Sequence, residues 1–299
     1  MDKLAAMRTF VEIVDQGSLT AAARALDRAP PTVVRTLATL EETLGARLLT
    51  RTTRRMSLTE EGRAYLDRCR RILADVEEAE QAVQAGDSEP RGEIRVTAPV
   101  LFGQRHVAPA ITAFLQQFAK VRIELLLLDR VVHLVEEGLD LGVRIGHLED
   151  SSMIVVPVGE MRRVVVASPD LVTRVGDPAH PEQLAPHPCV MFRGIAAGGS
   201  FSFQDGGRRR TVRVTSAFAC NQATAAVEAC EAGLGFGQFL SYQVEPQIRA
   251  GTLRVVLQEF EIPALPVSLV YPEARLMSSR LRAFVDWMKE QLRARPEIH

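Results

Sequence analysis

The chain of 299 residues lacks the marks of several protein classes. Its four cysteines include no Cys-x-x-Cys pair, so neither a zinc ribbon nor a disulfide framework is indicated. Its longest apolar run, residues 125–128 with their neighbours, is far shorter than the roughly 20 residues that a membrane-spanning helix needs. The formal net charge is −1, so no global positive field marks the chain as a nucleic-acid binder.

Motifs of common enzymes and cofactor sites are also lacking. There is no GxxxxGK[ST] phosphate loop, no HExxH and no GxSxG. Residues 233–237 are rich in glycine but follow an expected helix, the reverse of the order in dinucleotide-binding folds. His133 and Glu136 lie one helical turn apart without a third metal ligand nearby. We therefore expect no catalytic residue, no metal site and no cofactor, and a protein that is not an enzyme.

The N-terminus shows no export signal. Its expected helix carries Asp2, Lys3, Arg8 and Glu12 and has no long apolar centre. We therefore expect a cytoplasmic protein, in which the four cysteines are normally reduced. The composition, 46% hydrophobic and 24% charged, is that of an ordinary globular protein with room for two or three domains.

Residues 18–45, SLTAAARALDRAPPTVVRTLATLEETLG, predict two helices joined by a tight corner. Thr20 is the expected cap of the first helix, and residues 27–29 form the corner. Pro30 and Pro31 open the second helix, where proline fits well, and Gly45 ends it. This layout is typical of a helix-turn-helix that reads DNA.

The second of these helices has two distinct faces. Val33, Leu37, Leu40 and Leu44 follow the spacing of a buried stripe, and Thr32, Arg35 and Thr39 lie on roughly the opposite side. Upstream, an amphipathic helix over residues 4–14 is expected to pack on the other two. The polar, basic face is therefore free to meet a DNA groove.

Downstream, residues 48–49 and 56–58 predict two short strands around the basic turn 51–55. Such a hairpin beside a recognition helix is a wing, whose arginines would contact phosphates or the minor groove. The alternative is that the local arginines only form a solvated face. The helix pattern and the hairpin favour DNA binding, with the basic patch formed by Arg24, Arg28, Arg35, Arg47, Arg51, Arg54 and Arg55.

At this point the sequence resembles the LysR-type transcriptional regulators, through FVEIVDQGSLTAAARAL and LEETLGARLLTRTTRRMSLTEEGRAYL. The resemblance covers the whole chain and is strongest over residues 1–66. One departure concerns the start of the recognition helix, where Ala29, Pro30 and Val34 replace the family's usual Ser, Gln and Ser. Val34 is left to touch a thymine methyl, and Arg35 to reach guanine or phosphate. The expected DNA contacts are Thr20, Pro30, Pro31, Thr32, Val34, Arg35, Arg51, Thr52, Arg54 and Arg55.

Thr59 and the following glutamates begin a long helix that we expect to reach about residue 85. Along it, apolar residues alternate at spacings of four and three, a heptad seam that a second copy of the chain would cover. The alternative is that this stripe packs on its own domain, and the two roles can coexist. The resemblance also implies a dimerisation helix here and dimers of dimers. The expected seam is Tyr65, Cys69, Ile72, Val76, Ala79 and Val83.

After a polar, turn-rich linker at residues 86–92, strands and helices alternate, which indicates α/β lobes with largely parallel sheets. We expect strands at 93–98, 121–128 (buried on both faces), 141–145, 163–167, 189–192, 211–215, around 235 and at 267–271. Helices are expected at 102–118, 131–137, 222–232 and 281–292. The resemblance implies the type II periplasmic-binding-protein fold. The predicted domains are a winged helix-turn-helix (1–58), a linker helix (59–88) and an effector domain (91–299), with lobe I at about 91–162 and 267–299 and lobe II at about 163–266.

Open α/β sheets bind ligands beyond the carboxyl ends of their strands. Here such ends fall at residues 97–103, at 144–147 and before the helix that follows residue 220. A small molecule is the expected ligand, with an anion as one candidate. The alternatives are that Thr97 and Asn221 only cap helices, that His147 is a loop residue and that Phe201 is core. The expected effector contacts are Thr97, Pro99, Val100, Phe102, Gly146, His147, Phe201 and Asn221.

The pattern leads to a sequence-specific DNA-binding regulator of LysR type, homo-oligomeric and controlled by a small effector between two lobes. Three alternatives remain. The cleft can be filled by the chain's own side chains, giving a constitutive DNA-binding protein. The cysteines can act as redox sensors, which requires an exposed, activated thiolate. Lastly, the α/β part can be a solute-binding or enzymatic domain to which the DNA-binding head is incidental.

Overall fold

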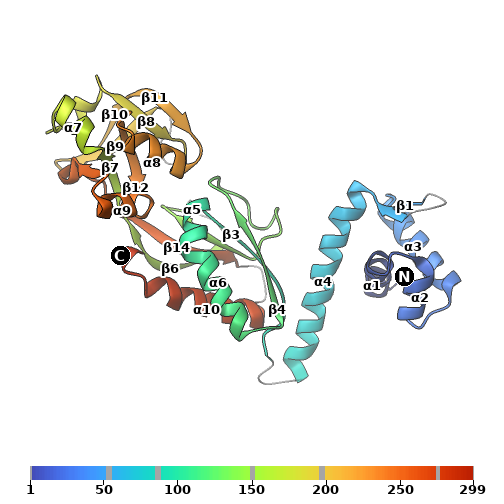
Figure 1. Cartoon of the computed structure of the whole chain (residues 1–299). Coiled ribbons are helices and arrows are strands. Elements are labelled where there is room, and N and C mark those ends of the chain that lie inside the picture. The colour runs from blue at the N-terminus through green and yellow to red at the C-terminus, as the bar shows by residue number, and fades with distance from the viewer. Residues whose placement is uncertain are drawn as a thin grey trace. The chain divides into compact units, whose positions relative to one another are not determined.

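The computed structural model describes residues 2–51, 56–84, 89–148, 152–194, 199–273 and 277–298. The chain divides into two compact units, Met1–Ser88 and Glu89–His299 (Figure 1). Each unit has its own hydrophobic core. They are described separately below.

The N-terminal unit is mainly helical. Its elements are α1 (Lys3–Asp15), α2 (Leu19–Ala25), α3 (Pro30–Leu44), β1 (Leu49–Arg51), β2 (Met56–Leu58) and α4 (Glu60–Gln84). The predicted helix-turn-helix and hairpin are thus present, and Asp27, with φ of 50°, turns the corner between α2 and α3. The apolar faces of the helices meet in one core that includes Phe10, Ile13, Val33, Leu37 and Leu40.

Two details of these helices differ from the sequence-based prediction. Ser18, not Thr20, caps α2, because the helix starts at Leu19 and the Ser18 hydroxyl accepts a hydrogen bond from the Ala21 amide at 3.0 Å. Thr20 therefore lies exposed in the first turn. Leu44 is 41% exposed and not part of the buried stripe, because the last turn of α3 extends past the core before Gly45 closes it at φ +65°.

Polar contacts fix the hairpin against the helices. The Glu41 carboxylate on α3 accepts hydrogen bonds from the Leu48 and Leu49 amides, at 2.8 and 3.2 Å. The Thr59 hydroxyl caps α4 as predicted, accepting from the Gly62 amide at 2.9 Å. Gly62 is required there, since a Cβ atom would lie only 2.0 Å from the Leu48 carbonyl oxygen.

The long helix α4 packs on its own unit at its N-terminal end. Cys69 is fully buried in the helical core, so the prediction that it faces a second chain is wrong, whereas Tyr65 packs against that core but is only half-buried, and its place in the seam stays a prediction. Both residues face α1, because the first turns of α4 run along it. Ile72, in contrast, is 40% exposed. The predicted seam side chains of Ala79 and Val83 lie outside the described residues.

The Glu89–His299 unit contains two five-stranded sheets. The first has the order β4-β3-β5-β14-β6, formed by β3 (Gly92–Ala98), β4 (Val121–Leu127), β5 (Leu141–Ile145), β6 (Met153–Met161) and β14 (Leu265–Pro272). The strand β14 returns to this sheet from the second one, as predicted, and runs antiparallel to β5 and β6. The prediction of a largely parallel sheet is therefore wrong. The strand β4 lies at the edge, with Arg122 and Glu124 exposed, so it is not buried on both faces.

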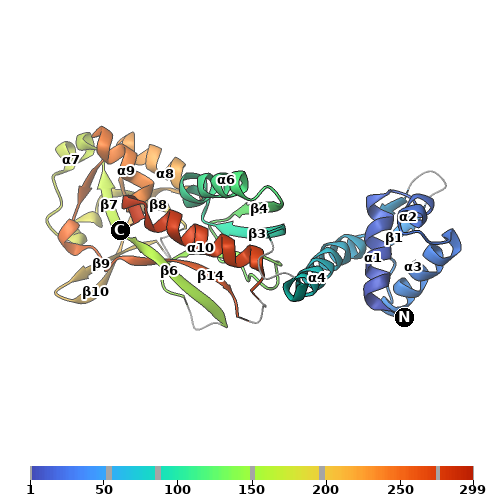
Figure 2. The same cartoon turned by 90° about the horizontal axis from the view of Figure 1, so that it is seen from below.

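Helices α6 (Ala108–Gln117) and α10 (Ser279–Arg293) cover one face of the first sheet (Figure 2). The predicted apolar stripe of α10 is confirmed, since Leu281, Phe284, Val285, Met288 and Leu292 are all buried. α5 (Val100–Phe102) and the π-helical turn η1 (Gly103–Val107) precede α6 without a break. The predicted helix at 131–137 is wrong. This segment forms turns, because Val132, Leu134 and Leu139 fold into a small core with Val270.

The second sheet has the order β11-β8-β12-β7-β13 and is also mixed. Its strands are β7 (Arg163–Ala167), β8 (Pro188–Phe192), β11 (Thr215–Cys220), β12 (Phe236–Leu240) and β13 (Arg254–Val256). Helices α8 (Ala223–Glu231) and α9 (Ser241–Ala250) pack on one face. The other face is covered by α7 (Pro169–Val175) and by a hairpin of β9 (Ser200–Asp205) and β10 (Arg208–Arg213). Short helices complete the unit: η2 (Pro181–Leu184), η3 (Gln258–Phe260) and η4 (Pro296–Ile298).

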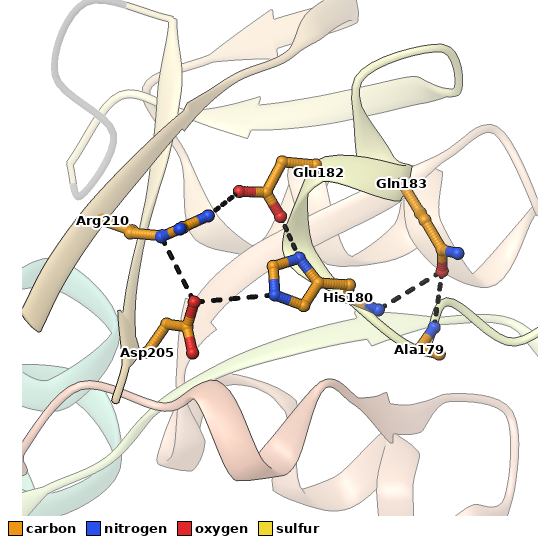
Figure 3. A network of polar contacts seen from close by, with 6 residues as sticks. All are labelled: Ala179, His180, Glu182, Gln183, Asp205 and Arg210. Carbon is orange, nitrogen blue, oxygen red and sulfur yellow. Dashed lines mark hydrogen bonds and ion pairs between the residues drawn. The ribbon is translucent and has the colours of Figure 1, made fainter. Parts of the chain in front are cut away.

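A polar network ties the β9–β10 hairpin to η2 (Figure 3). Arg210 on β10 pairs with Glu182 and, at 3.2 Å, with Asp205. The two nitrogens of the His180 ring face the same two carboxylates. Gly206 and Gly207, both with positive φ, form the hairpin turn, and the arginines after them lie on β10, where Arg210 is engaged within its own lobe.

Candidate functional site

The N-terminal end of α3 presents few backbone donors. Its cap residue, Ala29, makes no side-chain hydrogen bond, and Pro30 and Pro31 have no N–H. The first amide of the helix, that of Thr32, donates to the Ala29 carbonyl at 2.9 Å. This helix end therefore differs from one whose free amides bind a phosphate, and contacts from here must come from side chains.

The outward side chains of α3 include Thr32, Val34 and Arg35, all exposed. Arg35 makes no hydrogen bond or ion pair with any of the residues that the structure describes, so its guanidinium is available to an external acceptor. The Thr36 hydroxyl, in contrast, donates to the Thr32 carbonyl at 2.9 Å. Thr39, predicted on the outer face, is half-buried.

The strands of the predicted wing are described, but most of its basic turn is not. Thr52, Arg54 and Arg55, and the side chain of Arg51, lie outside the described residues. Beside them, the Thr50 and Ser57 hydroxyls are 2.8 Å apart across the hairpin, in register with the strand pairing. Arg24, Arg28 and Arg47 are exposed. The positive charge next to α3 thus rests partly on residues that are described and unobstructed.

In the second unit, the predicted effector residues divide by burial. Thr97, at the end of β3, is fully buried, and its hydroxyl has no partner among the described residues. Pro99 and Val100 are half-buried, and the Val100 amide donates to the Asp129 carboxylate at 3.0 Å. Burial raises the pKa of Asp129. Gly146 is half-buried, His147 and Asn221 are exposed, and no hydrogen bond between described residues joins these three.

Two phenylalanines predicted as effector contacts are core residues instead. Phe102 is fully buried against His106 and Tyr242, with ring centroids 4.8 and 5.3 Å away. Phe201 is fully buried under the second sheet by its place on β9. The prediction is wrong for both in this structure, because aromatic side chains beside a strand end pack inward where a helix or hairpin covers them. Asn221 also does not cap α8, whose cap residue is Gln222.

Arg144 on β5 falls in the predicted strand end 144–147, but sequence reasoning did not single it out as an effector contact. Its guanidinium donates to the Val143 and Val132 carbonyls, at 3.2 and 3.3 Å, and makes no ion pair within the described part of the chain. Burial lowers its pKa. It lies against Gly142, which is aligned with Thr97 in the parallel pairing of β3 and β5. A single arginine inside the apolar strand LGVRI was the signal that could have found it.

His106 is a second missed residue. It is 5% exposed and neither ring nitrogen has a partner within the described ranges. Burial, aided by Arg295, lowers the pKa of His106 to about 4. The ring is therefore neutral near pH 7. It lies on the π-helical turn η1, an irregularity often found at functional sites.

Models of two protein families match the chain. "Bacterial regulatory helix-turn-helix protein, lysR family" covers residues 4–63, and "LysR substrate binding domain" covers residues 87–293. The chain belongs to the LysR family of transcriptional regulators.

Curated relatives of this LysR-family regulator extend over nearly its whole length. An HTH-type transcriptional repressor of Pseudomonas aeruginosa is 34% identical over 300 residues, covering 100% of this chain and 95% of the relative. An HTH-type transcriptional regulator of Xanthomonas campestris is 36% identical, over 95% of this chain and 83% of the relative. The solved structure of CrgA from Neisseria meningitidis is 30% identical, with a TM-score of 0.61 over 96% of this chain and 98% of that one. These relatives are named regulators, which agrees with a role in transcription rather than catalysis.

Three of the four thiols of this regulator are buried. Burial raises the pKa of Cys69 to about 11 and that of Cys189 to about 12, and it raises the pKa of Cys230 as well. Cys220 is partly exposed, and its thiol lies 3.3 Å from the Gln222 carbonyl. Because sensing requires an accessible thiolate, this geometry gives no support to the redox alternative. Within the described ranges, no helix is long and apolar enough to cross a membrane, and no three potential ligands gather around a metal site.

Proposed function

We propose that this LysR-family protein binds its operator through α3 and the β1–β2 hairpin, as a homo-oligomer. The observation that carries this is the exposed Arg35 on the outer face of α3, within the matched helix-turn-helix, which pairs with none of the described residues. An arginine there reaches guanine O6 and N7 or a phosphate. Thr20, Thr32 and the hairpin residues Arg51, Thr52, Arg54 and Arg55 are the further proposed contacts.

The decisive experiment measures binding of the full-length protein to DNA from its own upstream region, over a salt series and with competitor DNA. Arg35→Ala removes a possible base contact, and we expect about 10-fold weaker specific binding. Arg122→Ala is the matched control, because it removes one exposed arginine from the other unit. Weak binding that is equal on all DNA and unchanged by Arg35→Ala would sink the proposal and make a ligand of the second unit the main function.

We infer that α4 also joins two copies. Its inner side packs on the protein's own core, while Ile72 remains 40% exposed and Val76 is half-buried. These two continue the apolar spacing, so a second α4 is the natural cover. Ile72→Glu should shift the molar mass measured by light scattering toward the monomer, whereas Arg63→Glu, at an exposed position on the opposite side of the same helix, should not. Equal masses for the two variants would refute this use of Ile72.

The effector is proposed to be a small molecule bound near the ends of β3 and β5, where Thr97, Pro99, Val100, Gly146 and His147 lie, with Asn221 contributing from the second lobe. Arg144 favours an anionic group, since it is half-buried without a carboxylate partner in the described chain. Calorimetric titration with a panel of carboxylic acids and neutral metabolites tests this. Binding to wild type that Arg144→Gln loses supports an anion site. Saturable binding that Arg144→Gln retains would assign the ligand elsewhere, and no binding favours a constitutive regulator.

Repression is the first regulatory outcome to test, because the Pseudomonas aeruginosa relative is named a repressor. A reporter under the chain's own upstream region, with and without the protein, distinguishes repression from activation. Reporter output that rises with the protein would refute repression.

A further inference from the structure

The N-terminal end of α3 carries an exposed apolar surface, formed by Pro30, Pro31 and Val34 and called here the apolar tip. Val34 is 37% exposed although it is a large hydrophobic residue. The inward residues Val33 and Leu37 belong to the core, so the tip is not a continuation of that core to the outside. A helix face that needs only solubility would carry polar residues here.

The tip has almost no hydrogen-bonding capacity of its own. Two of its residues are prolines without N–H groups, and Ala29 before them offers only a methyl group. The nearby Thr36 hydroxyl is directed to the Thr32 carbonyl. Thr32 and Arg35 are the exposed polar residues adjoining it. The tip therefore cannot read a base pair through an amide or hydroxyl pattern.

In a helix-turn-helix, the N-terminal residues of the recognition helix contact base edges in the major groove. The one apolar feature that a natural base pair presents there is the C5-methyl group of thymine. We propose that the apolar tip reads thymine methyl groups in the operator, with Val34 making the central contact and Arg35 the adjoining polar one. This inference rests on the proposed DNA-binding function and narrows the base pairs that the helix accepts.

The test removes the thymine methyl group and leaves the rest of the base pair unchanged. Full-length protein first selects preferred duplexes from a random pool, and each thymine of the selected half-site is then replaced by uracil. Uracil pairs like thymine but lacks the C5-methyl group. Removing one buried methyl should weaken binding about fourfold at the contacted positions.

Two variants assign the effect to a residue. Val34→Ala should bind the thymine duplex more weakly and lose the difference between thymine and uracil. Leu44→Ala removes an equally exposed apolar side chain from the other end of α3 and should keep that difference. Arg35→Ala should weaken binding to both duplexes alike. Thermal melting of each free variant checks that the helical unit remains folded.

The outcomes distinguish failure of methyl reading from failure of sequence-specific DNA binding. If selection enriches no sequence, the proposed sequence-specific binding fails. If a site is enriched but uracil changes the Kd by less than twofold everywhere, methyl reading is refuted while DNA binding stands. If uracil changes the Kd by the same factor in Val34→Ala as in the wild type, the assignment of the contact to Val34 is refuted. A smaller oligomer for Val34→Ala with an unchanged uracil effect would show that the tip contacts a second copy, which also overturns the proposal.

Discussion

The outer face of α3 and the interior around β3 treat side chains in opposite ways. On α3, an apolar residue, Val34, is exposed at the surface. Around β3, polar groups are enclosed: the Thr97 hydroxyl and both nitrogens of His106 are buried without partners in the described chain. Both arrangements raise the free energy of the isolated protein, the first through exposed apolar area and the second through unmade hydrogen bonds.

The two regions therefore differ in how a bound ligand would lower their free energy. An exposed apolar surface gains when a ligand covers it, and no rearrangement of the helix is needed. Buried unpaired groups gain when the surrounding packing moves or a ligand brings a partner. The exposed surface on α3 is thus available to a partner as it stands, whereas the unpaired groups around β3 gain hydrogen bonds only if a ligand or a change in packing brings them partners.

The largest expected effect tests whether the two units are separate bodies. Phe10 and Phe284 are fully buried, one in each core, so truncating either to alanine should cost about 3–5 kcal/mol. We expect Phe10→Ala to lower hydrogen-exchange protection in Met1–Ser88 alone, and Phe284→Ala to lower it in Glu89–His299 alone. Equal loss of protection in both units, from either variant, would mean that they unfold as one cooperative body and would break the comparison.

The next prediction concerns the buried histidine. Because the pKa of His106 is lowered to about 4, the unfolded chain binds its proton first as the pH falls. The stability linked to His106 is therefore complete above about pH 6.5, the ordinary histidine value, and is lost progressively down to pH 4. At pH 5 the loss should be about 2 kcal/mol.

Urea unfolding of the full chain between pH 7 and pH 5 measures this loss. His106→Phe should flatten the dependence on pH. If His106→Phe retains the full acid sensitivity, other groups carry it.

Where sequence alone predicted a helix correctly, it also identified most of the buried face. All five apolar positions predicted for α10 are buried, and Val33, Leu37 and Leu40 of α3 face the core, because a 3.6-residue period states which side of a helix is covered. The exposed positions Thr32, Val34 and Arg35 follow as the complement of that stripe. The prediction failed at Leu44, which lies past the end of the core and is exposed, and at Cys69, which the core buries.

The second unit was harder to predict for a physical reason. A strand end locates a site, but exposure there depends on distant segments, as when Tyr242 covers Phe102 and β9 places Phe201 under the sheet. The sheets are mixed because strands from distant parts of the sequence, such as β14, join them in the antiparallel direction. The local spacing of apolar residues does not encode such pairing. The segment at 131–137 has a helix-like spacing, yet Val132 and Leu134 pack with Val270 from far along the sequence.

A smaller effect is expected at the buried threonine. Replacing Thr97 by valine keeps its shape and removes an unpaired hydroxyl, so we expect stabilisation by about 1 kcal/mol. Thr9 is the matched control, since it is equally buried but its hydroxyl donates to the Ala5 carbonyl at 2.7 Å. Thr9→Val should give no such gain. If Thr97→Val instead lowers the free energy of unfolding in urea, the Thr97 hydroxyl must form a hydrogen bond in the folded protein. Only His106 would then remain as a buried unpaired group around β3 to set against the exposed Val34 on α3.

The smallest effect is predicted for the exposed network of His180, Glu182, Asp205 and Arg210 (Figure 3). These side chains are polar and paired, but they are 31–50% exposed, so water competes for each of them. Arg210→Gln should therefore shift the melting temperature by less than about 2 °C, and added salt should shrink even that shift. A larger shift that survives high salt would show that the hairpin depends on this pairing. Exposed, paired polar groups would then affect the melting temperature as much as buried, unpaired ones do, and burial would not determine how strongly a polar group affects stability.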